Sequence, residues 1–227
     1  MEDGVTVYER LSGKLAIESL IPSALVFSDD FRKSRLDVAL GRALSVAISM
    51  VGLVALAPLF GLIALAIKID SRGPVLFVHE RVGLNGRPFP LLKFRTMQPV
   101  DGKTSEWVRD NSDRITRVGW WLRRFRLDEL PQFINILRGE MNLVGPRPHP
   151  VSNLELFKAN IPYYSLRGVV RPGVTGWAQV RFGYANDLHE EIEKMRYDLF
   201  YIKHMSLEFD VRILLETVKI VLFGRGD

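Results

Sequence analysis

The longest stretch of the chain without a charged residue runs from Ala43 to Ile67. An apolar helix of that length can cross a hydrocarbon core of roughly 30 Å, so a single transmembrane helix is the ordinary interpretation. Two features favour a helix that enters and leaves by the same face. Pro58 bends the helix past its middle, and basic residues flank both ends, which the positive-inside rule assigns to one side. The pattern leaves the spanning and the re-entrant alternatives open.

Two runs of strand-forming residues follow, from Val75 to Val78 and from Phe89 to Phe94, with Asn85-Gly86 between them. Such runs on either side of an Asn-Gly turn predict a β-hairpin. Alternation along the second run places Lys93 and Arg95 on one face. Two neighbouring cations can bind one phosphate group, although a solvated strand face is the commoner origin of such a pair.

The rest of the chain is polar or helical in pattern. The polar segment from Asp101 to Asp113 predicts a mobile loop over a site. Apolar periodicity predicts four helices: Leu130 to Leu137 closed by Gly139, Leu154 to Tyr164, Asp187 to His204, and Leu207 to Phe223. In the third, Glu193, Lys194 and Arg196 are expected on the polar side. The fourth is strongly apolar with spaced cations, which favours a position in the lipid head-group plane over a core helix.

Adjacent carboxylates, Asp128 and Glu129, follow three arginines and precede the first of these helices. Asp is a favoured N-cap residue, so Asp128 is expected at a helix N-terminus, where the amides and the helix dipole favour anions. An ionised Asp beside arginines can serve as a nucleophile or a metal ligand in phosphoryl chemistry. An N-cap Asp with surface arginines explains this segment alone equally well.

Two rigid turns carry further basic residues. The prolines of Gly145-Pro146-Arg147-Pro148 fix the backbone around Arg147, which suits a preorganised anion contact. The turn from Arg171 to Trp177 repeats this arrangement and makes Arg171 and Thr175 candidates for the same role. A plain proline-rich turn is the structural alternative in both places.

Composition narrows the partners. The chain has 227 residues and a formal net charge of +5, so lipid head groups, nucleotides or nucleic acid are favoured ligands. The absence of cysteine excludes disulfides and thiolate metal sites. Residues 1–34 form a polar leader with an apolar patch from Leu20 to Phe27, interpreted as a linker or interfacial helix. Its acidic start lacks the basic region of a signal peptide.

The order of the motifs along the chain indicates a relationship to a known family. After the membrane segment come Glu80-Arg81-Val82-Gly83, Lys93-Phe94-Arg95-Thr96-Met97, Asp128-Glu129-Leu130-Pro131-Gln132, Gly145-Pro146-Arg147-Pro148 and Arg171 to Gln179. This order resembles the bacterial sugar transferases, the small monotopic phosphoglycosyl transferases that start glycoconjugate assembly on polyprenol phosphate. The resemblance covers about residues 33 to 227. Residues 7–31 also resemble the segment that precedes this domain in longer members.

The resemblance implies roles for individual residues. Asp128 matches the aspartate that attacks the β-phosphate of a UDP-sugar and releases UMP, and Glu129 matches its partner, which helps hold Mg²⁺ and can deprotonate the polyprenol phosphate. Lys93, Arg123 and Arg147 match basic active-site positions. With Arg95, Arg171 and Thr175, they form the expected set of phosphate and nucleotide contacts. The apolar segment matches a re-entrant helix hairpin broken near Pro58, which decides between the two membrane alternatives.

The resulting prediction is a helix-rich α+β monotopic membrane protein. It has a leader (1–34), a re-entrant helix (35–70) and a cytoplasmic catalytic domain with C-terminal interfacial helices (71–227), on the cytoplasmic face of the bacterial inner membrane. A UDP-sugar, undecaprenyl phosphate and anionic lipids are the expected partners, and a homodimer is left open. Nucleic-acid binding is disfavoured because the aromatic residues do not alternate with Lys or Arg as a stacking surface. A non-catalytic membrane scaffold is the remaining alternative.

Overall fold

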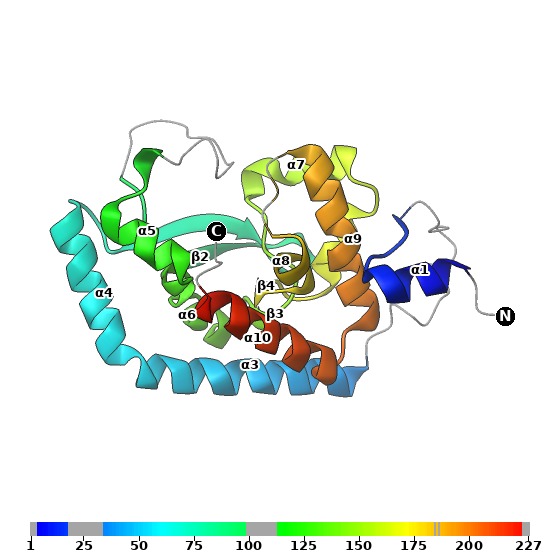
Figure 1. Ribbon diagram of the computed structural model, residues 1–227, viewed down its shortest axis with the longest axis horizontal. Helices are drawn as coiled ribbons and strands as arrows, with labels where there is room; N and C mark the ends of the chain where they lie inside the picture. The colour runs from blue at the N-terminus through cyan, green and yellow to red at the C-terminus, as the bar shows by residue number, and fades with distance from the viewer. Residues whose placement is uncertain (1–3, 18–33, 99–112, 184, 186, 224–227) are drawn as a thin grey trace.

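The fold is a helix-rich α+β arrangement built along a broken helix (Figure 1). The computed structural model describes residues 4–17, 34–98, 113–183, 185 and 187–223. Helix α3 (Arg35–Ala55) runs along one side of the molecule, and α4 (Ala57–Asp70) turns sharply away from it. The helices separate at Leu56, with Pro58 in the first turn of α4, where a missing backbone N–H costs no hydrogen bond. The expected break next to Pro58 is therefore present.

The face that α3 turns toward the protein is made of small residues. Gly41, Ser45 and Ser49 are buried, and their spacing of four places them on one side of the helix. The Ser45 hydroxyl donates to the Gly41 carbonyl at 2.8 Å and accepts from the Leu143 amide at 3.1 Å. The large apolar side chains face outward, with Val51 and Val54 68% and 76% exposed. This is the reverse of the pattern of a surface helix in a soluble protein.

Helix α3 also meets the length and composition of a membrane-crossing helix. Among the described residues it is the one helix that does so, with a mean hydropathy of 1.9. Its Arg42 points inward, where the guanidinium donates to the carbonyls of Ile136 and Met141 at 2.6 and 2.7 Å. A cation placed on the last carbonyls of a neighbouring helix is favourably positioned. The outer surface of α3 thus keeps its apolar character.

The predicted hairpin is confirmed. Strands β1 (Leu76–Val82) and β2 (Pro88–Phe94) pair antiparallel from Leu76–Phe94 to Val82–Pro88, around a turn in which Asn85 has a φ of 55°. β1 is longer than its apolar run indicated, because its polar second half pairs through the backbone. Phe94 packs with Ile63 and Ile67 of α4 in a small cluster that ties the hairpin to the broken helix.

Three short helical segments follow the hairpin. Helix α5 (Arg117–Arg124) begins at Thr116, whose hydroxyl accepts from the Gly119 amide at 3.0 Å. The single turn η5 (Leu127–Glu129) and α6 (Gln132–Leu137) come next, and Gly139, with a φ of 87°, closes α6 as expected. The predicted loop from Asp101 to Asp113 lies outside the described residues except for Asp113.

A second sheet was not foreseen. Strands β3 (Asn142–Val144) and β4 (Gly173–Thr175) are parallel, and three residues are too few to show a periodic pattern. Between them lie η6 (Val151–Asn153), α7 (Leu154–Asn160) and η7 (Tyr164–Val169). The helix expected to reach Tyr164 ends at Asn160, because Ile161 is extended and Tyr163 is left-handed.

Three further helices complete the main core. They are α8 (Trp177–Arg181), α9 (Leu188–His204) and α10 (Leu207–Leu222). The last two confirm the predicted helices, and Asp187 caps α9 by accepting from the Glu190 amide at 2.8 Å. One expectation for α9 was wrong: Lys194, assigned to its polar side, is buried and pairs with Glu191 at 3.2 Å.

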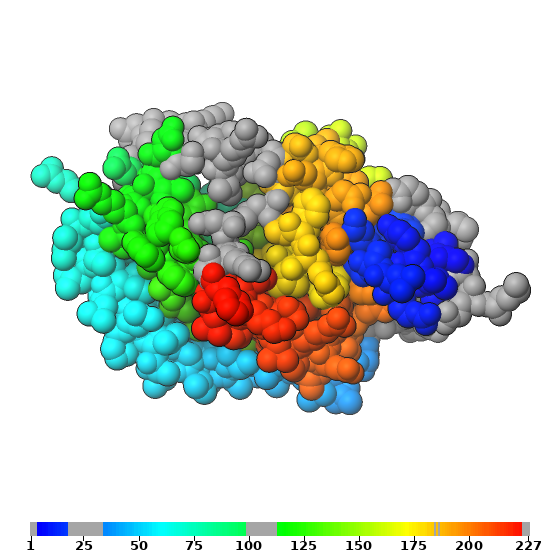
Figure 2. Space-filling model, in the orientation of Figure 1, coloured from blue at the N-terminus to red at the C-terminus, as the bar shows by residue number. Residues whose placement is uncertain are grey.

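The described part of the leader packs against this core. Helix α1 (Gly4–Ser12) lies on α9 in Figure 2, and the residues after it enter the same core. Leu15 is fully buried, and the Gly13 carbonyl accepts from the Trp177 indole at 2.8 Å. This differs from the expected linker or interfacial helix. The apolar patch from Leu20 to Phe27 lies outside the described residues.

Candidate active site

The two adjacent carboxylates lie in η5, between α5 and α6. Arg126 reverses the chain with a φ of 55°, and the turn that follows carries Asp128 and Glu129, 7% and 4% exposed. The expectation that Asp128 caps a helix is wrong. Helix α6 begins four residues later, at Gln132, and its N-cap residue is Pro131. The carboxylates are therefore held by a tight turn and by side-chain charges rather than by the start of a regular helix.

Glu129 is bound tightly by cations. Its Oε1 accepts from Arg147 Nη2 at 2.7 Å and from Lys93 Nζ at 3.0 Å, and Arg126 Nη1 lies 3.8 Å away. Burial alone would raise the pKa of this carboxyl. The three cations outweigh burial and hold the pKa of Glu129 well below its ordinary value. Glu129 is consequently ionised, and it gathers residues from β2 and from the Gly-Pro-Arg-Pro turn at one point.

Asp128 is in the opposite situation. No described residue forms a hydrogen bond or an ion pair with the Asp128 carboxylate. Lys93, Arg123 and Arg147 attract its charge from farther away. Burial raises the pKa of Asp128 to about 6, with the negative charge of Glu129 adding to the effect. Both carboxylates are buried side by side, yet only one has its charge neutralised by direct contacts. Asp128 is thus ionised above pH 6, and no residue in the described part of the chain bonds its carboxylate in competition with a substrate.

Arg123 supplies an unused donor near Asp128. Its Nη1 is buried and finds no hydrogen-bond partner within the part of the chain that the structure describes. A buried N–H without a partner costs free energy, so an anionic ligand beside Asp128 would satisfy it. Lys93, Arg123 and Arg147 are therefore the predicted cations that the structure brings to the carboxylate pair.

The other predicted contacts lie elsewhere. Arg95 is 5% exposed and donates through Nη2 to the Ser71 carbonyl and hydroxyl at 2.8 and 2.9 Å, at the end of α4. Its Nε and Nη1 are buried without partners among the described residues. Arg171 donates to the Gly139 carbonyl at 2.9 Å, and the Thr175 hydroxyl lies 2.7 Å from that of Thr217 on α10. These two side chains serve contacts between elements.

The two proline-containing turns are locked together through their glycines. The Gly145 amide donates to the Thr175 carbonyl at 2.9 Å, and the Gly173 amide donates to the Pro146 carbonyl at 3.0 Å. A Cβ added at Gly145, Gly173 or Gly176 would collide with backbone atoms of the opposite turn. Only glycine allows this approach. The turn that carries Arg147 is thus fixed by the turn that begins at Arg171.

A buried charge network behind Arg147 was missed by the sequence analysis. The Arg167 side chain donates to Asp198 Oδ2 at 2.7 and 2.9 Å and to the Arg147 carbonyl at 2.8 Å. His149 lies 2.6 Å from Arg167 Nη1 and 3.2 Å from Glu191 Oε2. The partners are far apart in sequence, so no local pattern pairs them. The signal that was available is the presence of charged residues within otherwise apolar helical positions of α9.

The carboxylates can contribute to a metal site only as a pair. The described residues contain no group of three or more His, Cys, Asp or Glu side chains placed to hold an ion. Magnesium needs fewer protein ligands, because it is commonly held by one or two carboxylates together with substrate phosphates and water. The cations on Glu129 all contact Oε1, which leaves the Asp128 oxygens and Glu129 Oε2 as ligands. The donor set fits such an ion.

Comparison with known proteins agrees with this geometry. The family model described as bacterial sugar transferase matches residues 36–224. The chain belongs to the bacterial sugar transferase family. Family membership confirms the resemblance drawn from the ordered motifs, and the carboxylate pair, Lys93 and Arg147 all fall within the matched residues.

Individual sugar transferases show how far the likeness extends. The UDP-N-acetylgalactosamine-undecaprenyl-phosphate N-acetylgalactosaminephosphotransferase of Aeromonas hydrophila is 38% identical over 221 residues, 97% of this chain and 52% of that protein. A UDP-glucose:undecaprenyl-phosphate glucose-1-phosphate transferase of Escherichia coli is 42% identical over 182 residues, 79% of this chain and 39% of that protein. One of the same name from Caulobacter vibrioides is 45% identical over 198 residues, 85% of this chain and 70% of that protein. The chain thus spans about half or less of the first two relatives.

Proposed function

We propose that this chain transfers a sugar-1-phosphate from a UDP-sugar to undecaprenyl phosphate with release of UMP, through a covalent intermediate on Asp128. The observation that carries the proposal is the contrast within the carboxylate pair. Glu129 is bound by Lys93 and Arg147, whereas Asp128 is ionised above about pH 6 and is not hydrogen-bonded within the described structure. A nucleophile must have its oxygen available, and its neighbour must not compete for the same substrate phosphorus.

The proposed reaction has two balanced steps. An Asp128 oxygen attacks the β-phosphorus of the UDP-sugar, the bond from that phosphorus to the bridging oxygen breaks, and UMP leaves. An oxygen of undecaprenyl phosphate then attacks the same phosphorus, the bond to Asp128 breaks, and the lipid diphosphosugar forms. Phosphoryl transfer depends mainly on alignment and charge neutralisation. Lys93, Arg123 and Arg147 supply that charge around the Asp128 carboxylate.

Magnesium would be held by Asp128 and by Glu129 Oε2, together with phosphate oxygens of the substrate. When bound, the ion would neutralise charge on the diphosphate of the UDP-sugar. Arg147 and Lys93 on Oε1 would keep Glu129 oriented toward that position. Arg95 lies at the end of α4, away from the carboxylate pair, and its two donors that find no partner among the described residues suit a second phosphate contact. Glu129 is a weak base because its pKa is low, so its main role is to hold these groups in place.

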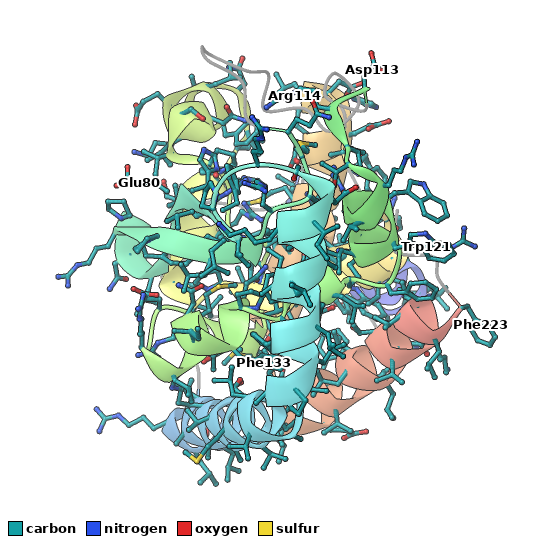
Figure 3. All side chains as sticks on the ribbon, turned by 90° about the vertical axis from the view of Figure 1, so that its left-hand side faces the viewer. Glu80, Asp113, Arg114, Trp121, Phe133 and Phe223 are labelled. Atoms are coloured by element: carbon teal, nitrogen blue, oxygen red, sulfur yellow. The ribbon has the colours of Figure 1, made fainter. Side chains whose placement is uncertain are left out.

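We also infer a position at the cytoplasmic face of the bacterial inner membrane, with α3 and α4 as a re-entrant helix. The outward apolar face of α3, the break at Leu56 and the flanking basic residues support it. Exposed apolar residues also occur on other elements. Trp121 of α5 and Phe223 after α10 are 58% and 72% exposed and project to the same side of the molecule in Figure 3. Trp is typical of a membrane interface.

The decisive test measures UMP release with undecaprenyl phosphate and a panel of UDP-sugars, including UDP-glucose and UDP-N-acetylgalactosamine. Asp128→Asn should abolish turnover, and the wild type with UDP-sugar alone should gain a phosphosugar on a peptide containing Asp128. Asp210→Asn is the matched control, because Asp210 is also buried with its pKa raised to about 6, by burial, but hydrogen-bonds Tyr201. Near-normal UMP release by Asp128→Asn would refute the covalent role. A wild type that binds undecaprenyl phosphate but releases no UMP would favour the scaffold alternative.

A further inference from the structure

The turn that carries Arg147 is held in place by hydrogen bonds that its backbone carbonyl groups accept. Pro146 and Pro148 have no backbone N–H to donate, so they contribute no amide hydrogen bonds to hold the turn. Instead, the carbonyls of residues 146–149 accept from donors on other elements: Gly173 N at 3.0 Å, Arg167 Nη2 at 2.8 Å, Arg81 Nη1 at 3.5 Å and Val82 N at 2.9 Å. The Arg147 carbonyl accepts its hydrogen bond from a side chain, that of Arg167.

Arg167 is itself fixed by a second element. Its Nε and Nη2 both donate to Asp198 Oδ2 on α9, and its Nη1 lies 2.6 Å from His149 Nδ1. The side chain is 8% exposed. A guanidinium is planar and donates in fixed directions, so holding Nε on Asp198 and Nη1 beside His149 also aims Nη2 at the Arg147 carbonyl. Helix α9 is thereby connected to the active-site turn through one side chain.

The surrounding charges are balanced and complete this support. Glu191 contacts His149 at 3.2 Å and Lys194 at 3.2 Å, so the two buried carboxylates of α9 face two buried cations. Burial and the charge of Arg167 lower the pKa of His149 to about 3, which keeps the imidazole neutral over the range in which enzymes work. His149 is therefore an uncharged member of this network near neutral pH.

We propose that Arg167, held by Asp198, is a positioning residue that acts on the reaction through Arg147. It fixes the backbone from which the Arg147 guanidinium reaches Glu129 Oε1 at 2.7 Å. The inference rests on the proposed function, because it assigns importance to the Arg147–Glu129 contact. A displacement of about 1 Å at a catalytic group can lower a rate by roughly a hundredfold, so releasing one end of this support should be measurable in kcat.

The test variant removes both charges together. Arg167→Met with Asp198→Asn avoids leaving a buried carboxylate without its partner, which alone would destabilise the fold. Arg167→Lys is the second variant, since it keeps the charge and gives up the planar fork. The control is Lys203→Met with Glu9→Gln, a pair joined at 2.8 Å between α1 and the last turn of α9. Melting temperatures establish that each variant is folded.

The kinetic readout is a mutant cycle with Arg147→Lys. We expect the Arg167→Met/Asp198→Asn variant to lower kcat for UMP release at least tenfold, Arg167→Lys to fall between it and the wild type, and the control to stay within twofold. In the Arg147→Lys background the same changes at 167 and 198 should have less than a threefold effect. Residues that act through one another give such non-additive losses. Losses that simply multiply would show that the network contributes stability alone and would overturn the proposal.

A second readout does not depend on turnover. Amide hydrogen exchange of a peptide covering residues 143–151 should be faster in the Arg167→Met/Asp198→Asn variant than in the wild type, and unchanged in the control. Exchange that is equal in all three proteins would overturn the positioning role even if activity falls. If the wild type releases no UMP but the turn still exchanges faster in the variant, the proposed function fails while the mechanical support of Arg147 stands.

Discussion

Asp128→Asn and Glu129→Gln, two isosteric changes at adjacent buried positions, should shift stability in opposite directions. The pKa of Asp128 is raised from 3.8 to about 6, chiefly by burial. One pKa unit corresponds to about 1.4 kcal/mol, so ionised Asp128 lowers the free energy of unfolding by up to about 3 kcal/mol. An amide of the same shape carries no charge. Asp128→Asn should therefore stabilise the folded state by about 1 to 3 kcal/mol, or roughly 3 to 10 °C in Tm for a chain of this size.

The pH dependence of this gain follows from the two pKa values. The unfolded carboxyl ionises near pH 3.8 and the folded one near pH 6, so the penalty in the wild type develops between these values and is constant above pH 6. About half of it is present at pH 5. The difference in Tm between Asp128→Asn and the wild type should accordingly be full at pH 7.5, about half at pH 5, and only about a fifth at pH 4.

Glu129→Gln is the matched opposite. The three cations around Glu129 Oε1 favour its charge, and removing the charge breaks the ion pairs of the buried Glu129 with the partly buried Lys93 and Arg147. Breaking a buried ion pair on one side costs about 3 to 5 kcal/mol, so Tm should fall by roughly 6 °C or more. Thermal melts followed by intrinsic tryptophan fluorescence in detergent measure both variants. If Asp128→Asn melts below the wild type at pH 7.5, the account of the carboxylate pair is wrong.

Three further expectations follow. The value of kcat/KM for UMP release should rise with pH through about 6, because the nucleophile must be ionised and the pKa of Asp128 is raised to about 6; a flat profile between pH 5 and 7 would contradict this. Single cysteines placed at positions 34 and 71 should both resist an impermeant maleimide in intact spheroplasts; labelling of position 34 alone would show that the apolar segment spans the membrane. Removing residues 1–17 should lower Tm by roughly 5 °C or more, since Leu15 is fully buried and Trp177 loses its bond to Gly13; an unchanged Tm would show that the leader is dispensable.

The sequence predicted those parts of the site whose residues lie within a few positions of one another in the chain. Asp128 and Glu129 are adjacent, and Arg147 is singled out by its own prolines, so each could be recognised within a few residues. Lys93 lies beside Glu129; alternation along β2 placed it on one face with Arg95, and the family resemblance placed it at the site. Arg95, two residues on, donates to Ser71 at the end of α4 instead.

The parts that were missed depend on contacts between distant segments. Arg167 and Asp198 are 31 residues apart, and a charged residue on a helix is ordinarily assigned to solvent, as Lys194 was. No sequence pattern predicted the packing of residues 4–17, because the two buried apolar residues, Leu15 and Ile17, do not indicate which core they enter. For α3 a signal was present in the sequence: Gly41, Ser45 and Ser49 recur every four residues and mark the side that faces the protein.

The contact between Gly145 and Gly173 closes the segment between them into a loop. The chain leaves the active site after the Arg147 turn, forms η6, α7 and η7, and returns to touch its own starting point at β4. The base of this loop is fixed by backbone contacts that tolerate no side chain, and the loop also carries Arg167, whose side chain donates to the Arg147 carbonyl. The entropic cost of closing a loop also grows only slowly with the length of the loop. An insertion at the exposed end of α7 therefore leaves the base of the loop closed, whereas a change that moves η7 should reach Arg147 through Arg167.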